Sequence, residues 1–453
     1  MTEDGARGIP ADLLITGATV LVHDDAGEVS FADRHRILVH GDTITAVEPD
    51  TGPAPAASLV IDAGGTVAMP GFINCHTHSP MVMFRGAAED VPDERWFNEF
   101  IWPMEVNLTE TDVEVATWLA AAEMIRAGVT TFADHYFDMD AIARVVDASG
   151  LRAVLGSTFF SSDGAAGLER SLGFALERRG TAAGRITTAL APHATYTVTD
   201  DDLAATAEAA REHDLLVHVH ASESRGQTRH SIDRHGYTPV EALRRAGLLD
   251  VQTLIAHGIG IVAEDVPALS AAGGRVGVAS APKGYLKHGP DSTPVRLLAA
   301  AGVPVGLATD GAASNNTLDV WESMTYLALV NKAAERDPAY LPARAALRHA
   351  TTESAAALGM TGTIGRLAPG HQADILLVDL DAPRLQPIHD LANTLVYSGR
   401  SDDIDTTIVA GRVLMRDRKL LTVDLEAILD DLRPRLARLT DRSHGRSIQN
   451  YDA

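Results

Sequence analysis

The chain has 453 residues, enough for one large barrel with an accessory domain or for two or three ordinary domains. Hydrophobic residues make up 45% of the sequence, a fraction typical of globular proteins with a large core. The formal net charge of −23 is spread along the chain and would repel a nucleic-acid backbone or an anionic membrane, so we expect neither as a partner.

Cysteine usage and the first residues bear on the compartment. Cys75 is the single cysteine, which excludes an intramolecular disulfide and fits a reducing environment. No apolar run reaches the roughly 18 residues that a membrane span needs. The N-terminus lacks the basic and apolar regions of a signal peptide. We therefore expect a cytoplasmic protein.

Residues 11–69 contain β-branched runs separated by Gly and Asp turns, without the periodicity of a helix. Similar runs return in ADILLVDLD (373–381) and TTIVAGRVLMRDRK (406–419). These two sets predict one small β-sandwich built from both termini, from residues 1–69 and 371–453. The amphipathic pattern of residues 424–442 predicts a C-terminal helix that packs on this sandwich or on a neighbouring subunit.

Residues 70–370 alternate between apolar strand-like runs and helical segments. Thr109 and Thr199 each stand three residues before an aspartate, a capping arrangement that predicts helices starting just after them. Counting the run that ends at His78, eight strands are predicted, the others being VTTFADHYF, LRAVLGSTFF, RITTALAPHATY, LLVHVHASE, VQTLIAHGIGI, GRVGVASAP and VPVGLATDG. This alternation predicts a (β/α)8 TIM barrel. A doubly wound sheet is the alternative, but no glycine-rich nucleotide turn follows the first strand.

The C-terminal ends of the strands carry the active site of such a barrel. His76 and His78 end the first strand, and alternate side chains of a strand share a face, so both imidazoles point the same way. Later strands add further groups at their ends: His193 on the fourth, His218, His220 and Glu223 on the fifth, His257 on the sixth and Asp310 on the eighth. Nitrogen and oxygen ligands of this kind suit a divalent metal with one position left for water.

We expect one metal ion, since the fourth strand ends in His193 and has no lysine that could be carbamylated to bridge two metals. The candidate ligands are His76, His78, Asp310 and one histidine of the fifth strand. His218 and His220 share a strand face, so alternation does not choose between them. We choose His220 because it is nearer the strand's end, and we expect His218 to be a buried, hydrogen-bonded histidine in the layer beneath.

Two further groups match what hydrolysis requires. Glu223 could carry a proton between the attacking water and the leaving group if a poorly hydrated site tunes its pKa. His257 could hydrogen-bond the attacking water and fix its orientation. The packing alternative for His257 is a satisfied core histidine.

The segment from Pro80 to Leu108 is long and aromatic. It contains Trp96, Phe97, Phe100 and Trp102, followed by Glu105. Loops of this length over a barrel mouth are usually lids or substrate walls. Most of these aromatics could simply pack on the barrel, whereas Glu105 is a candidate acceptor facing the ligand.

Several motifs together resemble the deaminase and triazine-hydrolase group of the amidohydrolase superfamily, which includes 5′-methylthioadenosine/S-adenosylhomocysteine deaminases. The resemblance covers nearly the whole chain. Its motifs are PGFINCHTHSPMVMFRG, WPMEVNLT, AEMIRAGVTTFAD, APHATYT, HVHASES, IAHGIGI, ATDGAASNNTLDVWESM and GRLAPGHQADILLVDLD.

This resemblance implies hydrolytic deamination of an aminopurine nucleoside. It implies one divalent metal, most often Zn²⁺ with Fe²⁺ or Mn²⁺ as alternatives, and a homo-oligomer, a dimer or tetramer. The implied roles are metal binding by His76, His78, His220 and Asp310, acceptance of the water's proton by Asp310, protonation of the ring nitrogen by Glu223, orientation of the water by His257, and nucleoside binding by Glu105 and His193.

Two departures from the resemblance bear on the substrate. Ser157 stands where an arginine for an amino-acid carboxylate would be expected, which favours a neutral 5′-deoxy or 5′-thio adenosine over S-adenosylhomocysteine. Lys283 and Tyr285 replace an asparagine-rich pattern after the seventh strand and have no assigned role. The alternatives are another amino- or chloro-heterocycle, such as a guanine-like base, a pterin or an s-triazine, and a silent barrel that acts as a binding module.

Overall fold

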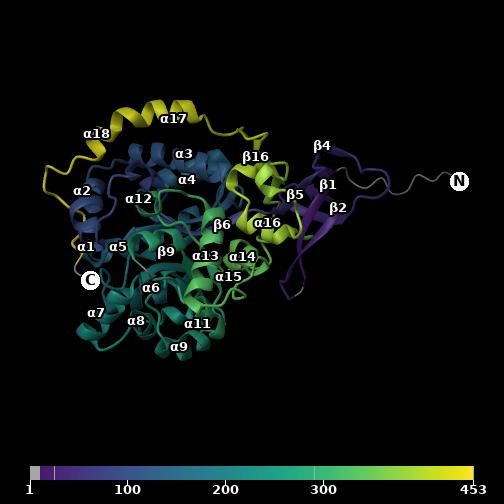
Figure 1. The fold of residues 1–453 in the computed structure, drawn as a ribbon. Coiled ribbons are helices and arrows are strands. Elements are labelled where there is room, and N and C mark those ends of the chain that lie inside the picture. Colours follow the sequence, from purple (N-terminus) through teal and green to yellow (C-terminus); the bar gives the residue numbers. More distant parts are fainter. Residues whose placement is uncertain (1–10, 25, 290, 452–453) are drawn as a thin grey trace.

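The computed structural model describes residues 11–24, 26–289 and 291–451. The first ten residues, on which the expectation about a signal peptide partly rests, lie outside this description. The strands form two sheets, one with eight strands and one with nine. Figure 1 shows the eight-stranded sheet inside a shell of helices, with the N-terminal strands β1, β2 and β4 projecting to one side.

The nine-stranded sheet joins the two ends of the chain. Its order is β17-β16-β15-β14-β5-β1-β2-β3, with β4 paired to β1. The antiparallel pairing of β14 with β5 connects the C-terminal strands to the N-terminal ones. The strands are β1 (Ala11–His23), β2 (Val29–His40), β3 (Thr43–Pro49), β4 (Ala57–Asp62), β5 (Thr66–Pro70), β14 (Ile375–Asp379), β15 (Ile404–Val409), β16 (Arg412–Arg416) and β17 (Lys419–Leu420).

This sheet encloses a hydrophobic core of its own, to which Leu13, Ile37 and Ile375 belong. The amide of Ala373 donates to the Asp42 carbonyl over 2.7 Å, so the far edge of the sheet returns beside the segment that enters β14. A single mixed sheet thus folds over its own side chains, as expected for a small sandwich assembled from both termini.

The eight-stranded sheet is the predicted barrel, and each strand pairs in parallel with the next. Beyond the last strand, the amides of Thr309 and Asp310 donate to the His76 carbonyl over 3.3 and 3.0 Å, which brings the eighth strand's end to the first. The strands are β6 (Phe72–Thr77), β7 (Val129–Tyr136), β8 (Arg152–Phe159), β9 (Ile186–Pro192), β10 (Leu216–Ala221), β11 (Thr253–His257), β12 (Val276–Ser280) and β13 (Val305–Leu307).

The helices cover the outside of the barrel. The two predicted caps are confirmed, because the Thr109 and Thr199 hydroxyls accept the amides of Asp112 and Asp202 at the starts of α3 and α6. The main helices are α3 (Glu110–Arg126), α4 (Met139–Ser149), α5 (Ala165–Arg178), α6 (Asp200–His213), α7 (Arg225–His235), α8 (Pro239–Arg245), α9 (Val266–Ala271), α10 (Pro282–His288), α11 (Val295–Ala300), α12 (Ala312–Asn315), α13 (Val320–Glu335), α14 (Ala343–Ala350), α15 (Thr352–Ala357) and α16 (Leu391–Tyr397). None of the helices in the described residues is both long and apolar enough to cross a bilayer.

The C-terminal helix is interrupted and lies on the barrel helix α3, which corrects the expectation that it packs on its own sandwich; packing on a neighbouring subunit stays a prediction. Pro434 separates α17 (Leu425–Leu432) from α18 (Leu436–Leu439), since proline has no amide proton to donate. Arg435 and Arg438 form ion pairs of 2.9 and 2.6 Å with the buried carboxylate of Asp112 on α3. Figure 1 shows α17 running along α3.

A buried ion pair fastens the barrel to the terminal sheet. Arg152, at the start of β8, donates from Nε to Asp374 Oδ2 over 2.9 Å, and both side chains are 4% exposed. Asp374 also accepts the amide of Ala410 over 2.8 Å, and Arg152 donates to Gln372 over 2.7 Å. Because both side chains are buried, the charge of each is stabilised mainly by the other and not by solvent.

Replacement of Arg152 by methionine is expected to lower the free energy of unfolding by about 3–5 kcal/mol, because it leaves the Asp374 carboxylate buried and unpaired. Urea unfolding followed by circular dichroism measures the change. The matched control is Arg95→Met, which removes an exposed ion pair with Glu99 and should change stability by less than about 1 kcal/mol. Equal stabilities of the two variants would contradict this account of the junction.

Candidate active site

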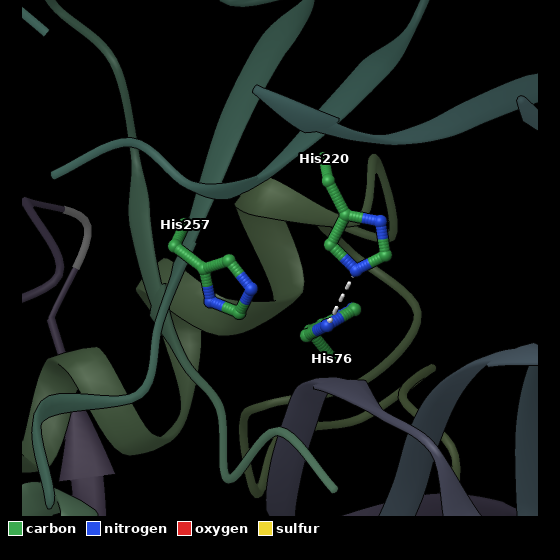
Figure 2. A group of neighbouring side chains, drawn as sticks. All are labelled: His76, His220 and His257. Atoms are coloured by element: carbon green, nitrogen blue, oxygen red, sulfur yellow. Dashed lines mark hydrogen bonds between the residues drawn. The ribbon is translucent and has the colours of Figure 1, made fainter. Parts of the chain in front are cut away.

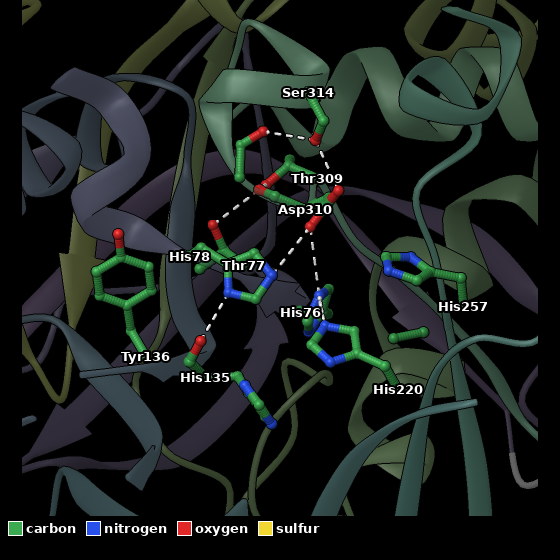
Figure 3. A network of polar contacts seen from close by, with 12 residues as sticks. His76, Thr77, His78, His135, Tyr136, His220, His257, Thr309, Asp310 and Ser314 are labelled. Carbon is green, nitrogen blue, oxygen red and sulfur yellow. Dashed lines mark hydrogen bonds and ion pairs between the residues drawn. The ribbon is translucent and has the colours of Figure 1, made fainter. Parts of the chain in front are cut away.

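Five side chains from distant parts of the sequence meet at the C-terminal ends of the barrel strands. The Nε2 atoms of His76 and His220 are 3.3 Å apart. Asp310 Oδ1 lies 3.4 Å from Nε2 of His76 and 3.3 Å from Nε2 of His78. Two groups of potential metal ligands, each with its donor atoms within 4.8 Å of one another, share His76: one adds His220 and His257, the other His78 and Asp310. Figure 2 shows the first group and Figure 3 both.

Hydrogen bonds at the far side of two of these rings decide which nitrogen faces the centre. His78 Nδ1 lies 2.6 Å from the carbonyl of His135, and His220 Nδ1 lies 2.7 Å from the carbonyl of His193. A carbonyl oxygen only accepts, so both Nδ1 atoms must carry the proton. In the neutral form of each ring, the form that binds a metal, the Nε2 atoms of His78 and His220 therefore present lone pairs to the centre.

The other two rings are fixed by side chains. His76 Nδ1 lies 2.8 Å from Nε2 of His218, the fully buried histidine expected in the layer beneath. His257 Nδ1 lies 3.1 Å from the hydroxyl of Tyr285, whose own proton goes to the carbonyl of Ala279 over 3.3 Å. The Tyr285 oxygen must then accept from His257, which leaves His257 Nε2 without that proton.

This donor set fits a divalent metal. Burial lowers the pKa of His76 to about 3 and that of His220 well below its usual value, so both imidazoles are neutral, the form that binds metals. The Nε2 atoms of His76 and His220, 3.3 Å apart, are close enough together for one divalent ion to be bound by both. Asp310 supplies a carboxylate there, and Ser314 holds its other oxygen with a hydrogen bond of 2.6 Å.

Glu223 lies beside this cluster and lines the same hollow as His257 and Asp310. Burial raises its pKa to about 7, against a hydrogen bond of 3.1 Å from Gln227 Nε2 that favours the ionised form. The amide of Glu223 in turn donates to Gln227 Oε1 over 2.8 Å. A carboxyl group with such a pKa can both give and take a proton near neutral pH.

Two neighbouring hollows border the cluster, and they share Trp96, Phe97, Glu223, His257 and Asp310. The inner hollow is the one lined also by Glu105, Tyr136, His193 and Tyr196. The outer hollow is the one lined also by Asp93, Tyr285, His288, Asp291 and Tyr451.

Glu105 and His193 both reach the inner hollow. The hydroxyl of Tyr136 donates to Glu105 Oε1 over 2.6 Å, and burial raises the pKa of Glu105 to about 7. Burial lowers the pKa of His193 to about 3, and its Nδ1 lies 2.8 Å from the Thr197 hydroxyl. The inner hollow thus offers an acceptor and a neutral imidazole to a ligand.

The aromatic segment becomes a wall of these hollows. It consists of α1 (Asp93–Arg95), the π-helical turn η2 (Trp96–Ile101) and α2 (Trp102–Glu105). Trp96, Phe97 and Trp102 line the inner hollow. Phe100 does not, and instead lies 4.1 Å beneath the guanidinium of Arg442.

The sequence reasoning missed three neighbouring residues at the end of β7. The His135 ring lies 4.7 Å from that of His220 and lines the inner hollow, while its carbonyl holds His78. Tyr136 holds Glu105, and the buried carboxylate of Asp134 accepts the amide of Ser79 over 3.1 Å. The signal was present, since these residues end the second barrel strand as the other site residues end theirs.

Ser157, Lys283 and Tyr285, the departures noted in the sequence, differ in how they relate to the site. Thr158, not Ser157, lines the inner hollow. Lys283 pairs with Glu322 over 2.6 Å and therefore has a structural partner. Tyr285 belongs to the site, because it fixes the orientation of His257.

Comparison with known proteins agrees with this geometry. Residues 67–414 match the amidohydrolase family. A 5-methylthioadenosine/S-adenosylhomocysteine deaminase of Pelotomaculum thermopropionicum is 41% identical over 438 residues, which cover 95% of this chain and 100% of the relative. A 5'-deoxyadenosine deaminase of Methanosarcina mazei is 38% identical over 426 residues, 93% of this chain and 96% of the relative.

A solved structure resembles the whole chain. It is that of an adenosine deaminase from Xanthomonas campestris with bound zinc, at 31% identity and a TM-score of 0.90. The match covers 95% of this chain and 99% of that one. The barrel with its terminal sheet is therefore a shared architecture, and the Xanthomonas protein holds zinc.

We expect the protein to contain a divalent metal and His220→Asn to lose most of it, because one of the converging Nε2 donors is removed. Elemental analysis by mass spectrometry of the purified proteins measures the metal per chain. His230→Asn, an exposed histidine on α7, is the matched control and should retain the metal. Equal metal content in both variants would contradict a site at His220.

Proposed function

The chain belongs to the amidohydrolase family, and on that premise we propose that it is a metal-dependent hydrolytic deaminase of adenosine-type nucleosides. The observation that carries this proposal is the cluster of four imidazoles and Asp310 beside Glu223, a carboxyl whose pKa is raised to about 7. Hydrolytic deamination needs an activated water and a proton donor for the ring, and these groups match both requirements.

The proposed metal ligands are His76, His78, His220 and Asp310. A divalent metal held there supplies Lewis acidity that makes a water molecule easier to deprotonate. Zn²⁺ is the proposed ion, supported by the zinc of the Xanthomonas campestris structure. The same donor set also suits Fe²⁺ and Mn²⁺.

The protein's own groups would move the protons. The Asp310 carboxylate accepts a proton from the attacking water, and His257 orients that water by a hydrogen bond. Glu223 in its protonated form donates to the ring nitrogen next to the carbon that bears the amine. A carbon–oxygen bond forms and the carbon–nitrogen bond breaks as Asp310 passes its proton to the amine, which leaves as ammonia. The new hydroxyl group becomes the ring carbonyl, and its proton restores the protonated form of Glu223.

Glu105 and His193 would hold the nucleoside. One oxygen of Glu105 accepts from Tyr136, so the other is available to a sugar hydroxyl. The neutral His193 ring offers Nε2 to the base, since its Nδ1 faces Thr197. As in the sequence-based expectation, we propose a homo-oligomeric assembly for the protein.

The 5′ side of the substrate is proposed to be neutral. None of the described residues that line the inner or outer hollow is an arginine or a lysine, so neither hollow offers a fixed cation for a carboxylate. This supports 5′-deoxy- and 5′-thio-substituted adenosines, such as 5′-methylthioadenosine, over S-adenosylhomocysteine.

Ammonia release from a panel of 5′-methylthioadenosine, 5′-deoxyadenosine, adenosine, S-adenosylhomocysteine, guanine and an amino-s-triazine tests the proposal. We expect the 5′-deoxy and 5′-thio nucleosides to give the highest kcat/KM. Glu223→Gln should reduce kcat by at least about 100-fold, because the amide cannot donate the ring proton. Turnover of guanine or the triazine without turnover of any adenosine analogue would overturn the proposed substrate class.

The pH dependence of kcat/KM should report Glu223. Because the protonated form is the active one, kcat/KM is expected to fall as the pH rises through about 7, the pKa of this buried carboxyl. Gln227→Leu removes a donor that favours the ionised form, so the pKa rises and the fall moves to higher pH. His230→Leu on the same helix is the control and should leave the profile in place. If the decline in kcat/KM of Gln227→Leu occurs at the same pH as in the wild type, or at a lower pH, the assignment of this decline to Glu223 is contradicted.

A further inference from the structure

The end of the chain returns to the mouth of the barrel. After α18, residues 440–451 contain no helix or strand. Figure 1 shows this segment, in yellow, leaving α18 and passing α2 towards α1. We call residues 440–451 the C-terminal strap.

Polar contacts fasten the C-terminal strap to the aromatic segment at three points. Asn107 Nδ2 donates to the Asp441 carbonyl over 2.7 Å, and Arg442 donates to the Glu99 carbonyl over 2.6 Å. Asn98 binds the backbone of Tyr451 on both sides, donating from Nδ2 to its carbonyl over 2.8 Å and accepting its amide over 2.7 Å. The last described residue is therefore held in a defined position.

The side chain of Tyr451 is packed into the site. Its ring is stacked on Phe97 with centroids 4.8 Å apart and planes at 15°, and its edge contact with Tyr196 is 5.5 Å. Tyr451 is 7% exposed, although it is near the end of the chain. It lines the outer hollow together with Glu223 and Asp310.

The outer hollow is suited to an uncharged, apolar group. Two of its acidic side chains are already paired, Asp93 with His288 over 2.8 Å and Asp291 with Arg225 over 3.2 Å. The apolar side chains of its lining are Trp96, Phe97, Ile259, Tyr285 and Tyr451. Aromatic faces of this kind bind flat or apolar groups by contact area.

We propose that Tyr451 is a substrate-binding residue, and that the C-terminal strap holds the aromatic wall against the bound nucleoside. This inference rests on the proposed function. The ring of Tyr451 packs on Phe97 and Tyr196, and burial raises the pKa of its hydroxyl and so makes it a poorer proton donor, so its contribution is to binding. The C-terminal strap, residues 440–451, thereby contributes to substrate affinity.

Steady-state kinetics of the full-length protein test the proposal. Tyr451→Ala should raise KM for 5′-methylthioadenosine by about tenfold and leave kcat within about twofold. Tyr451→Phe keeps the ring and should retain both constants. Asn98→Ala, which removes both backbone contacts, should raise KM in the same direction. Tyr397→Ala, an exposed tyrosine on α16, is the control.

Hydrogen exchange of residues 96–107, followed by mass spectrometry, gives a readout independent of turnover. Tyr451→Ala and Asn98→Ala should exchange faster there than the wild type and Tyr397→Ala. Unchanged exchange together with an unchanged KM, or a loss in kcat alone, would overturn the role of the strap. If the wild type turns over no adenosine analogue, the proposed function fails, while the exchange experiment still decides whether the strap holds the wall.

Discussion

The hydrogen bonds at Nδ1 of the four histidines are the constraint on which the site depends. Each ring has a fixed partner at Nδ1: a carbonyl that accepts the proton for His78 and His220, the Nε2 of His218 for His76, and the Tyr285 hydroxyl for His257. Their Nε2 atoms are thereby free to face a common centre. Closure of the barrel then brings the eighth strand's Asp310 to the same point, through its amide bond of 3.0 Å to the His76 carbonyl.

Burial shifts the pKa values of both the imidazoles and the carboxyl groups of this site. The same poorly hydrated surroundings that keep His76 and His193 neutral raise the pKa of Glu223 and of Glu105 to about 7. The aromatic segment and the C-terminal strap exclude water from above, while the barrel does so from below. Fold and reactivity are therefore linked, because a looser wall would rehydrate these groups and return their pKa values towards normal.

Much of the fold and of the candidate site could be predicted because its signals are local. Strand alternation placed His76 and His78 on one face, and the caps at Thr109 and Thr199 marked where helices begin. Because the barrel strands are parallel, their C-terminal ends were then expected at one rim of the barrel. His135 was not predicted as a site residue, although it stands near the end of its barrel strand, as the predicted site residues do on theirs.

The sequence by itself determined the barrel, the terminal sheet and the set of imidazole and carboxyl groups at the strand ends, because periodicity and capping depend on residues close in the chain. Only the tertiary structure decided that Tyr285 orients His257, that Asp112 pairs with the arginines of the C-terminal helical segment, and that Tyr451 lines the outer hollow. These contacts join elements whose approach is set by barrel closure and packing. A local sequence pattern does not specify which side chains from distant parts of the chain come into contact.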